Sequence, residues 1–311
     1  MDEVTFKFVD SVVELFGKET LDRLAQEMYQ PLWKAAVDLH HRNRVYYRVV
    51  LRMTNQGIKH VFLDENYRPD SSVDLNIIRK NRRFIRIQWI KDYSDGSYWM
   101  LLIRWENVQP SGEPEIAKLL GSLAPQIDPS FSFNLIHNSP GCQCVLLPSL
   151  TNRVHLRSID LSYYGPISHD FLKDQINNSP FLEKVTLAGK WPESVHPLLA
   201  TFCLKEGPRR PVEVELWIET NLEIDINYLR TFFDAWKANG TLQCKLTVKG
   251  KLLPYEELQA LKAMGLVVLV DPAWNKSTIA LKHDEKKSFA ICTQAFLDFS
   301  LSFYSCECDL P

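Results

Sequence analysis

Two pairs of cysteines stand close together in the sequence: Cys142 with Cys144, and Cys306 with Cys308. Four thiolates gathered from two such pairs would be a ligand set for a structural zinc ion. Zinc sites usually space paired ligands two to four residues apart, however, whereas each of these pairs has one intervening residue. We therefore interpret these cysteines as small buried hydrophobic residues or tail thiols, and expect no metal and no other cofactor.

The sequence contains none of the common motifs that carry catalysis. Gly17-Lys18-Glu19-Thr20 is superficially similar to a phosphate-binding loop, but no glycine lies five residues before Gly17. The patterns G-x-G-x-x-G, G-x-S-x-G and H-E-x-x-H are absent. We predict that the chain is not an enzyme. A hydrolase or transferase with an unfamiliar site is the alternative, and a pocket holding two titratable groups with opposed pKa shifts would support it.

One basic cluster has aromatic residues within it. Phe84 and Trp89 lie among its cations, so a nucleic-acid site would use the charges for phosphates and the rings for stacking. A charged edge strand explains the same residues, because charge prevents edge-to-edge pairing, and we favour that interpretation over nucleic-acid binding. The cations are Arg79, Lys80, Arg82, Arg83, Arg86 and Lys91.

Composition and charge narrow the class of protein. The 311 residues are 45% hydrophobic and 24% charged, which is typical of a soluble globular chain, and the formal net charge is −2. No apolar run is long enough to span a bilayer, and no secretory signal follows the acidic start Met1-Asp2-Glu3. Seven cysteines, an odd number, fit a reducing compartment. We expect a cytoplasmic or nuclear protein without membrane contact.

The first 44 residues predict three short helices that would position any N-terminal site. The apolar residues of the first helix repeat at helical spacing, and Gly17 is expected to end that helix in the left-handed conformation. Pro31 suits the first position of the third helix, where its missing N–H costs nothing. The apolar positions of the first helix are Phe6, Val9, Val12, Val13 and Phe16.

From Val45 the hydrophobic period changes toward two, which predicts strands. We expect strands over residues 45–53, 58–63, 83–91 and 97–105, with a hairpin turn at Ser94-Asp95-Gly96. A short helix is expected around residues 116–123. This part of the chain is therefore predicted to be rich in β-structure.

The second half looks repetitive. Leu156-Arg157-Ser158-Ile159-Asp160-Leu161 has the form L-x-x-I-x-L, and the same form returns 26 residues later at Leu182. Strand candidates at 212–216 and 242–246 follow, each with a helix candidate after it. Asp225 is expected to cap one such helix, which would end at Asn239-Gly240.

A βα unit repeated every 26–30 residues is typical of a leucine-rich-repeat-like solenoid. An ordinary α/β domain with a mostly parallel sheet is the competing interpretation. We predict an α/β fold with three N-terminal helices, a β-rich middle region and an irregular βα repeat. The expected divisions are a helical motif over 1–44, a β-rich region over 45–110, a connecting segment over 111–150, a repeat-like domain over 151–284 and a tail over 285–311.

The N-terminal block resembles a degenerate F-box. The resemblance lies in Val4-Thr5-Phe6, the apolar helix through Phe16, Leu21 with Leu24, and Leu32-Trp33-Lys34-Ala35-Ala36. An F-box usually opens with Leu-Pro, where this chain has Val4 and Thr5. An F-box-like start, a β-rich middle and irregular repeats together are similar to the F-box-like families expanded in nematodes.

The resemblance implies a partner and a set of partner-binding residues. An F-box docks on a Skp-type adaptor of cullin ubiquitin ligases, so the first helices would face that adaptor or shape the helices that do. Packing of these helices on the protein's own β region is the alternative, because three short helices cannot bury every apolar face alone. The implied residues are Phe8, Val9, Val12, Val13, Leu21, Leu24 and Trp33.

In a repeat solenoid, strand residues between the buried leucines line an exposed inner face, and here that face would be polar and of mixed charge. We predict that it binds an unknown protein target. The chain would then be a substrate-recruiting F-box-like subunit; a non-enzymatic scaffold of the same fold, without adaptor binding, is the alternative. The expected target-binding residues are Ser158, Asp160, Lys184, Thr186, Glu213, Glu215, Trp217, Gln243 and Lys245.

Overall fold

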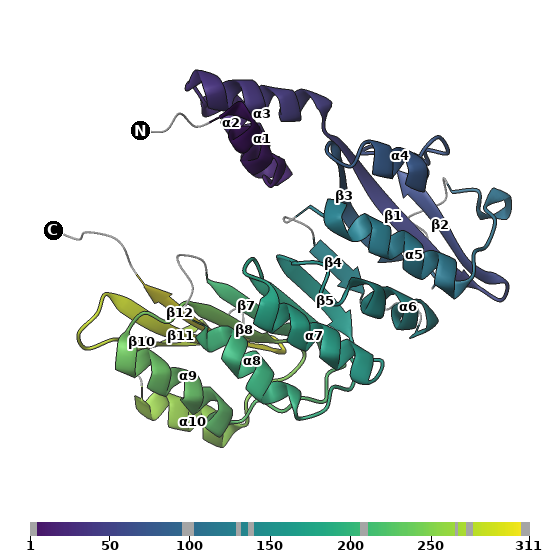
Figure 1. Cartoon of the computed structure of the whole chain (residues 1–311). Helices are drawn as coiled ribbons and strands as arrows, with labels where there is room; N and C mark the ends of the chain where they lie inside the picture. Colours follow the sequence, from purple (N-terminus) through teal and green to yellow (C-terminus); the bar gives the residue numbers. More distant parts are fainter. Residues whose placement is uncertain are drawn as a thin grey trace. The chain divides into compact units, whose positions relative to one another are not determined.

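The chain is a mixed α/β protein that folds as two compact units (Figure 1). The computed structural model describes residues 5–94, 103–128, 132–135, 140–205, 211–264, 267–271 and 276–305. The first unit comprises Met1–Ile159 and Pro166–Phe181, and the second comprises Asp160–Gly165 and Leu182–Pro311. The first unit contains a three-stranded sheet and the second contains most strands of a nine-stranded sheet, so each unit is described by itself.

The first unit begins with the three predicted helices, α1 (Phe6–Glu14), α2 (Lys18–Glu27) and α3 (Pro31–Asn43). Thr5 caps α1 through its hydroxyl, which accepts from the N–H of Phe8. Pro31 occupies the first turn of α3, as predicted. The prediction for Gly17 was wrong: Leu15 ends α1, and Gly17 has an extended backbone (φ −70°) as the N-cap of α2.

A three-stranded sheet follows, with the strand order β2-β1-β3. Strands β1 (Val45–Thr54) and β2 (Gly57–Leu63) form an antiparallel hairpin, and β3 (Ile85–Asp92) runs parallel to β1 after the short helix α4 (Leu75–Lys80). These three strands confirm the change of hydrophobic period at Val45. The predicted strand over 97–105 and its hairpin turn lie largely outside the described residues, and Trp105 itself is in a single 3-10 turn.

The rest of the first unit is mainly helical. It contains α5 (Glu113–Leu123), the short strand β4 (Ser132–Leu135), α6 (Pro140–Leu150) and α7 (Pro166–Asn178). Helix α5 packs against α6, and these two helices contact β2 and β1 respectively (Figure 1). The segment expected as a connector, 111–150, therefore supplies two core helices of this unit, because Ile116, Leu120, Leu123 and Leu147 are buried.

The second unit alternates strands and helices: β5 (Ser158–Ser162, in this unit from Asp160), β6 (Lys184–Ala188), α8 (Val195–Leu204), β7 (Val212–Leu216), α9 (Ile226–Asn239), β8 (Cys244–Val248) and α10 (Tyr255–Met264). Strands β6, β7 and β8 are parallel and adjacent in chain order. Asp225 caps α9, and Gly240 ends it with a φ of +64°, both as predicted.

The sheet of the second unit is completed by an antiparallel meander of β9 (Val267–Asp271), β10 (Lys276–Lys282), β11 (Ser288–Ala295) and β12 (Asp298–Ser305). The strand order from β5 is β5-β6-β7-β8-β12-β11-β10-β9, so β12 pairs with β8 where a further parallel strand would otherwise lie. The prediction of a tail over 285–311 was wrong for residues 288–305. Alternating core residues show why: Phe299, Leu301 and Phe303 are buried.

Helices α8, α9 and α10 lie along one face of this sheet (Figure 1). That face carries the core, in which Trp236 of α9 packs against Phe303 of β12 with ring centroids 5.8 Å apart. The indole N–H of Trp236 donates a 2.9 Å hydrogen bond to the hydroxyl of Ser288. Side chains alternate across strands, so the residues between those of the core lie on the opposite face, where Lys245, Phe289 and Tyr304 are exposed.

Candidate protein-binding surfaces

Most residues implied to bind an adaptor form the internal core of the three N-terminal helices. Val9, Val13 and Leu21 are buried together with Ala36 and Val37 of α3. Leu24 and Trp33 are half-buried and pack against this cluster. These five residues therefore hold the three helices to one another.

A separate stripe of apolar residues lies on another side of α1. Phe8 and Leu15 are 58% and 72% exposed, and the half-buried Val12 stands between them. Their spacing of four and then three residues places all three on one side of the helix. We call Phe8, Val12 and Leu15 the α1 stripe. Leu15 was not predicted, because it is not among the apolar positions that repeat at helical spacing up to Phe16.

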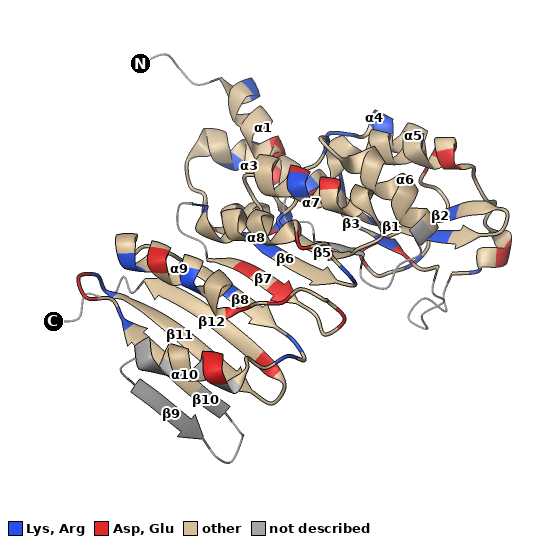
Figure 2. Cartoon of the chain, turned by 90° about the horizontal axis from the view of Figure 1, so that it is seen from below, with Lys and Arg blue, Asp and Glu red and all other residues tan. Residues whose placement is uncertain are grey.

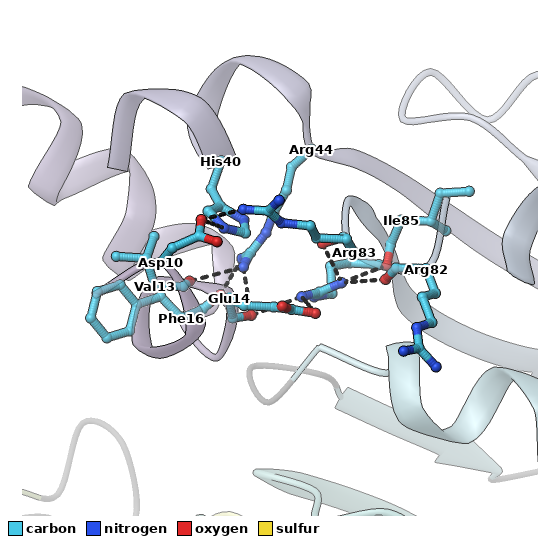
Figure 3. A network of polar contacts seen from close by, with 10 residues as sticks. Asp10, Val13, Glu14, Phe16, His40, Arg44, Arg82, Arg83 and Ile85 are labelled. Carbon is cyan, nitrogen blue, oxygen red and sulfur yellow. Dashed lines mark hydrogen bonds and ion pairs between the residues drawn. The ribbon is translucent and has the colours of Figure 1, made fainter. Parts of the chain in front are cut away.

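Arg44 fixes the C-terminal end of α1 to the end of α3 (Figure 3). Its buried guanidinium donates to the main-chain oxygens of Glu14 at 2.7 Å, Val13 at 3.1 Å, and Phe16. The last carbonyl groups of a helix have no partner within the helix, and a cation at that end also complements the helix dipole. Arg44 therefore satisfies groups that α1 leaves unpaired.

Arg86 reaches the same helix end from β3. Its Nη2 donates to the Glu14 oxygen at 2.7 Å, and its Nη1 donates to the Ile85 oxygen at 2.8 Å. Burial, followed by the charge of Arg44, lowers the pKa of Arg86. Since this arginine is 6% exposed and bonded to main-chain oxygens, it anchors α1 to the three-stranded sheet.

A second anchor joins α1, α3 and the loop before β3. Asp10 forms an ion pair with Arg83, and its Oδ1 lies 3.1 Å from Nε2 of the fully buried His40 (Figure 3). Burial lowers the pKa of His40 and outweighs the hydrogen bond to Asp10, while the charges of Arg44 and Arg83 lower it further. The neutral imidazole therefore belongs to a structural network.

The predicted basic cluster is divided among internal contacts. Arg83 and Arg86 belong to the anchors just described, and Arg79 donates to the hydroxyl of Ser122 at 2.9 Å. Lys91 lies over the ring of Tyr93 at 5.1 Å. These four cations are therefore committed to the fold, which supports the structural interpretation over phosphate binding.

In the second unit, the parallel register brings the predicted charged residues into one row. Lys184 on β6 is opposite Glu213 on β7, and Glu213 is opposite Lys245 on β8. Thr186, Glu215 and Thr247 form the next row on the same face. Figure 2 shows acidic positions on β7. The residues expected to bind a target are thus neighbours across three strands.

Ion pairs connect this row. The Lys184 Nζ lies 3.5 Å from a Glu213 oxygen and 3.2 Å from a Glu215 oxygen, and the Lys245 Nζ lies 3.0 Å from Glu213. Partial burial raises the pKa of Glu213, but the hydrogen bond from Lys245 and the charge of Lys184 together lower it overall. Half-burial lowers the pKa of Lys184, but Glu213, Glu215 and Asp160 outweigh burial and raise this pKa overall.

The other predicted target residues are placed unevenly. Asp160 on β5 acts on the Lys184 charge, and Gln243 donates to the hydroxyl of Ser305. Thr186 is buried, and Trp217 is half-buried immediately after β7. Ser158 is half-buried at the start of β5. The usable part of this face therefore centres on Lys184, Glu213, Glu215 and Lys245.

Two aromatic residues on the same face were not predicted. Tyr304 of β12 and Phe289 of β11 are paired across the strands and are 49% and 37% exposed. Ser302, two residues before Tyr304, is directly opposite Lys245, so the aromatic pair adjoins the charged row. The alternation of apolar and polar residues in Phe299-Ser300-Leu301-Ser302-Phe303 is the sequence signal that would have predicted this strand. We call the charged row and this aromatic pair the open sheet face.

The cysteine pairs do not come together as a described site. Cys142 and Cys144 lie in α6, whereas Cys306 and Cys308 fall outside the described residues. Burial raises the pKa of Cys142 far above its ordinary value. Within the ranges that the structure describes, no group of three or more His, Cys, Asp or Glu residues is arranged to hold a metal ion.

A hollow at the start of α9 and α10 contains acidic side chains and is a candidate site for an acid-base pair. It is lined by Asp225, Lys251 and Glu257, and burial and the Asp225 charge raise the pKa of Glu257. Asp225 itself accepts a 2.7 Å hydrogen bond from the N–H of Tyr228 as the cap of α9. One shifted carboxyl beside a capping residue is a weak basis for acid-base catalysis.

Comparison with known proteins gives no relative for the chain. No family model matches it, and no curated protein and no solved structure is significantly similar to it. Among the described residues, none of the helices combines the length and the apolar character that crossing a membrane requires.

Proposed function

We propose that this chain is a non-catalytic, substrate-recruiting subunit of a cullin-type ubiquitin ligase. The N-terminal helices would bind a Skp-type adaptor, and the open sheet face would bind the protein target. The F-box-like resemblance provides the class of adaptor, and the transfer chemistry would belong to other subunits. In this proposal the irregular βα repeat of the second unit is a leucine-rich-repeat-like recognition domain.

The α1 stripe is the observation that carries the proposal. The helices already have a core in Val9, Val13 and Leu21, so Phe8 and Leu15 add nothing to it. Large apolar residues gathered on one side of an exposed helix mark a protein-interaction site. The anchors from Arg44 and Arg86 hold α1 in place, which reduces the entropy lost when a partner binds.

The open sheet face has the composition of a target-binding surface. Polar charged residues surround a pair of exposed aromatic rings, Tyr304 and Phe289, and aromatic residues are frequent anchors of protein interfaces. Lys184 and Lys245 are held by Glu213 and Glu215, so a target would meet a pre-ordered pattern of charge.

Co-purification with a panel of Skp-type adaptors tests the adaptor half of the proposal. The informative variant is Phe8→Asp with Leu15→Asp, and Phe6→Asp is the matched control, since Phe6 is 42% exposed on α1 but lies off the stripe. Loss of one interface anchor typically costs about 2 kcal/mol, or about thirtyfold in affinity. We expect the double variant to lose binding and the control to keep it.

Failure of the wild-type chain to bind across the panel would refute adaptor binding, and equal binding by the double variant would refute binding through the α1 stripe. Trp33→Ala is unsuitable for this test, because Trp33 packs against the helical core and its loss would disturb the helices themselves. Circular dichroism of each variant establishes that the helices are retained.

A scaffold without adaptor binding is the second candidate, and a specific observation favours it. Arg44, Arg86 and the Asp10–Arg83 pair attach the helices to the protein's own sheet region. In that case the α1 stripe would bind no adaptor, and target binding would still depend on the open sheet face. The scaffold would be identified by two results together. The wild-type chain would bind a target but no adaptor, and the Lys245→Glu, Tyr304→Asp variant would lose that target.

A further inference from the structure

A hollow of about 570 Å³ lies beside β2 in the first unit. β2 is an edge strand of the three-stranded sheet. The walls come from residues 60–62 of β2, residues 69–73 of the following loop and residues 103–108 before α5. Val61, Val73 and Ile103 make the lining largely apolar. The volume lies within the range of about 300–1,000 Å³ that is common for binding sites.

The backbone of β2 offers hydrogen bonds toward this hollow. Ile58 exchanges two 2.9 Å hydrogen bonds with Ser111 beyond the edge, and the Phe62 oxygen accepts one from the N–H of Asp70. His60 stands midway between them, so its N–H and C=O point to the same outer side. Within the described ranges these two groups of His60 have no backbone partner. The edge is therefore paired at both ends and open at His60.

Two charged groups line the hollow, the guanidinium of Arg104 and the carboxylate of Asp70. Arg104 lines it and forms no ion pair with a described carboxylate. The Asp70 carboxylate is already engaged, since it accepts from the N–H of Ser72 at 3.0 Å and from the hydroxyl of Tyr47 at 3.4 Å. The His60 Nδ1 is buried with no hydrogen-bond partner among the described residues, and burial lowers the pKa of this histidine.

We propose that the edge of β2 binds a short extended peptide that carries a carboxylate. The peptide backbone pairs with His60, one apolar side chain enters the hollow, and the carboxylate pairs with Arg104. Addition of a strand to an open sheet edge is a common mode of peptide recognition, in which backbone bonds give affinity and side-chain pockets give specificity. The inference rests on the proposed function only in making this peptide a part of the target.

Fluorescence anisotropy of labelled peptides with the full-length chain tests the proposal. The probe is fluorescein-Thr-Leu-Thr-Glu-amide, and its counterpart ends in Lys-amide. A third peptide, fluorescein-Thr-Leu-Thr with a free carboxyl terminus, separates a terminal carboxylate from a side-chain carboxylate. We expect one of the two acidic peptides to bind about tenfold or more tightly than the Lys peptide, since a charge-assisted hydrogen bond is worth about 1.5–3 kcal/mol.

Variants assign the binding to the two named groups. Arg104→Gln should abolish the preference for the carboxylate, whereas Arg68→Gln, an exposed arginine outside the lining, should keep it. His60→Pro removes the outward N–H without breaking the ladder to β1 and should weaken every peptide about tenfold, while His60→Ala retains the N–H and the binding. A peptide with N-methyl-leucine probes the same pairing from the ligand side if the proline variant unfolds.

Several outcomes would overturn the proposal. They are binding of none of the peptides, equal binding of the acidic and Lys peptides, or an unchanged preference in Arg104→Gln. A wild-type dimer in analytical ultracentrifugation that His60→Pro dissociates would instead assign the edge to a second copy of this chain. Adaptor binding through the α1 stripe is measured in a separate experiment. Failure of the peptide test would therefore refute the peptide site and leave the adaptor proposal standing.

Discussion

The guanidinium of Arg44 donates a 2.7 Å hydrogen bond to the main-chain oxygen of Glu14. The residue that follows α3 thereby completes the end of α1, together with Arg86 from β3. Two buried cations share one helix terminus, and the carbonyl groups of that terminus have no alternative partner within the helix.

Arg44→Met should therefore destabilise the first unit strongly. Its removal takes the side-chain donor from the main-chain oxygen of Phe16 and one of the donors from those of Val13 and Glu14, so we expect the free energy of unfolding to fall by about 3 kcal/mol. Urea denaturation monitored by circular dichroism measures this change. Arg42→Met is the control, because Arg42 is exposed and bonds only to the oxygen of Asp38. Equal losses in the two variants would show that Arg44 does not support the helix end.

Stability should decrease as the pH falls below about 6.5, the ordinary pKa of histidine. Burial lowers the pKa of His40 and of His60 in the folded state. The unfolded chain then binds more protons than the folded chain, so the stability present above that pH is lost as the pH falls through the folded values.

His60→Phe is the variant that checks this pH dependence, because a phenyl ring replaces an imidazole whose Nδ1 has no described partner. The expected result is a shallower fall in the free energy of unfolding between pH 7 and pH 5. Urea titrations at several pH values provide the measurement. The exposed His41 gives the control variant, His41→Phe, which should retain the wild-type slope.

Glu213→Gln should weaken the charged row of the open sheet face. Glu213 is shared by Lys184 and Lys245, and the pairs are partly exposed, so we expect a loss of about 0.5–1 kcal/mol. The loss should shrink in 1 M salt, where the Debye length is about 3 Å. Thermal unfolding at low and high salt measures both effects, with the exposed Glu219→Gln as the matched control. Salt-independent loss would argue against an ionic cause.

Phe303→Ala should destabilise the second unit by about 3–5 kcal/mol, as is usual for a fully buried phenylalanine. Phe303 packs edge-on against Phe233, with ring centroids 5.4 Å apart, and also against Trp236. Phe296→Ala is the control from the neighbouring turn, since Phe296 is 64% exposed. Similar denaturation midpoints for the two variants would mean that β12 is not part of the cooperative core.

Local patterns predicted the elements better than their assembly. The period of three to four residues located α1 to α3, and the L-x-x-I-x-L segments located β5 and β6. Asp225 and Gly240 were identified as the ends of α9 because a cap depends on neighbouring residues alone. Pairing of β12 with β8 joins segments about fifty residues apart, and no local signal specifies that choice.

The candidate surfaces were predicted only in part, for a similar reason. The F-box resemblance implied Phe8 and Val12, but it could not separate these positions from the buried Val9 on the same helix. That separation depends on which side of α1 packs against α3, and the arginines that fix the end of α1 bind main-chain oxygens and leave no trace in side-chain patterns. The charged row was predicted because alternation along a strand fixes the face of each residue.

The pairing of β12 with β8 also has a consequence for synthesis of the chain. Translation produces β8 well before β12, so for that interval the nascent second unit exposes one side of β8 and the buried faces of Trp236 and Phe233. Unpaired strand edges and uncovered aromatic residues are the features that chaperones bind and that lead to aggregation. The second unit can therefore complete its core only after synthesis has passed Ser305.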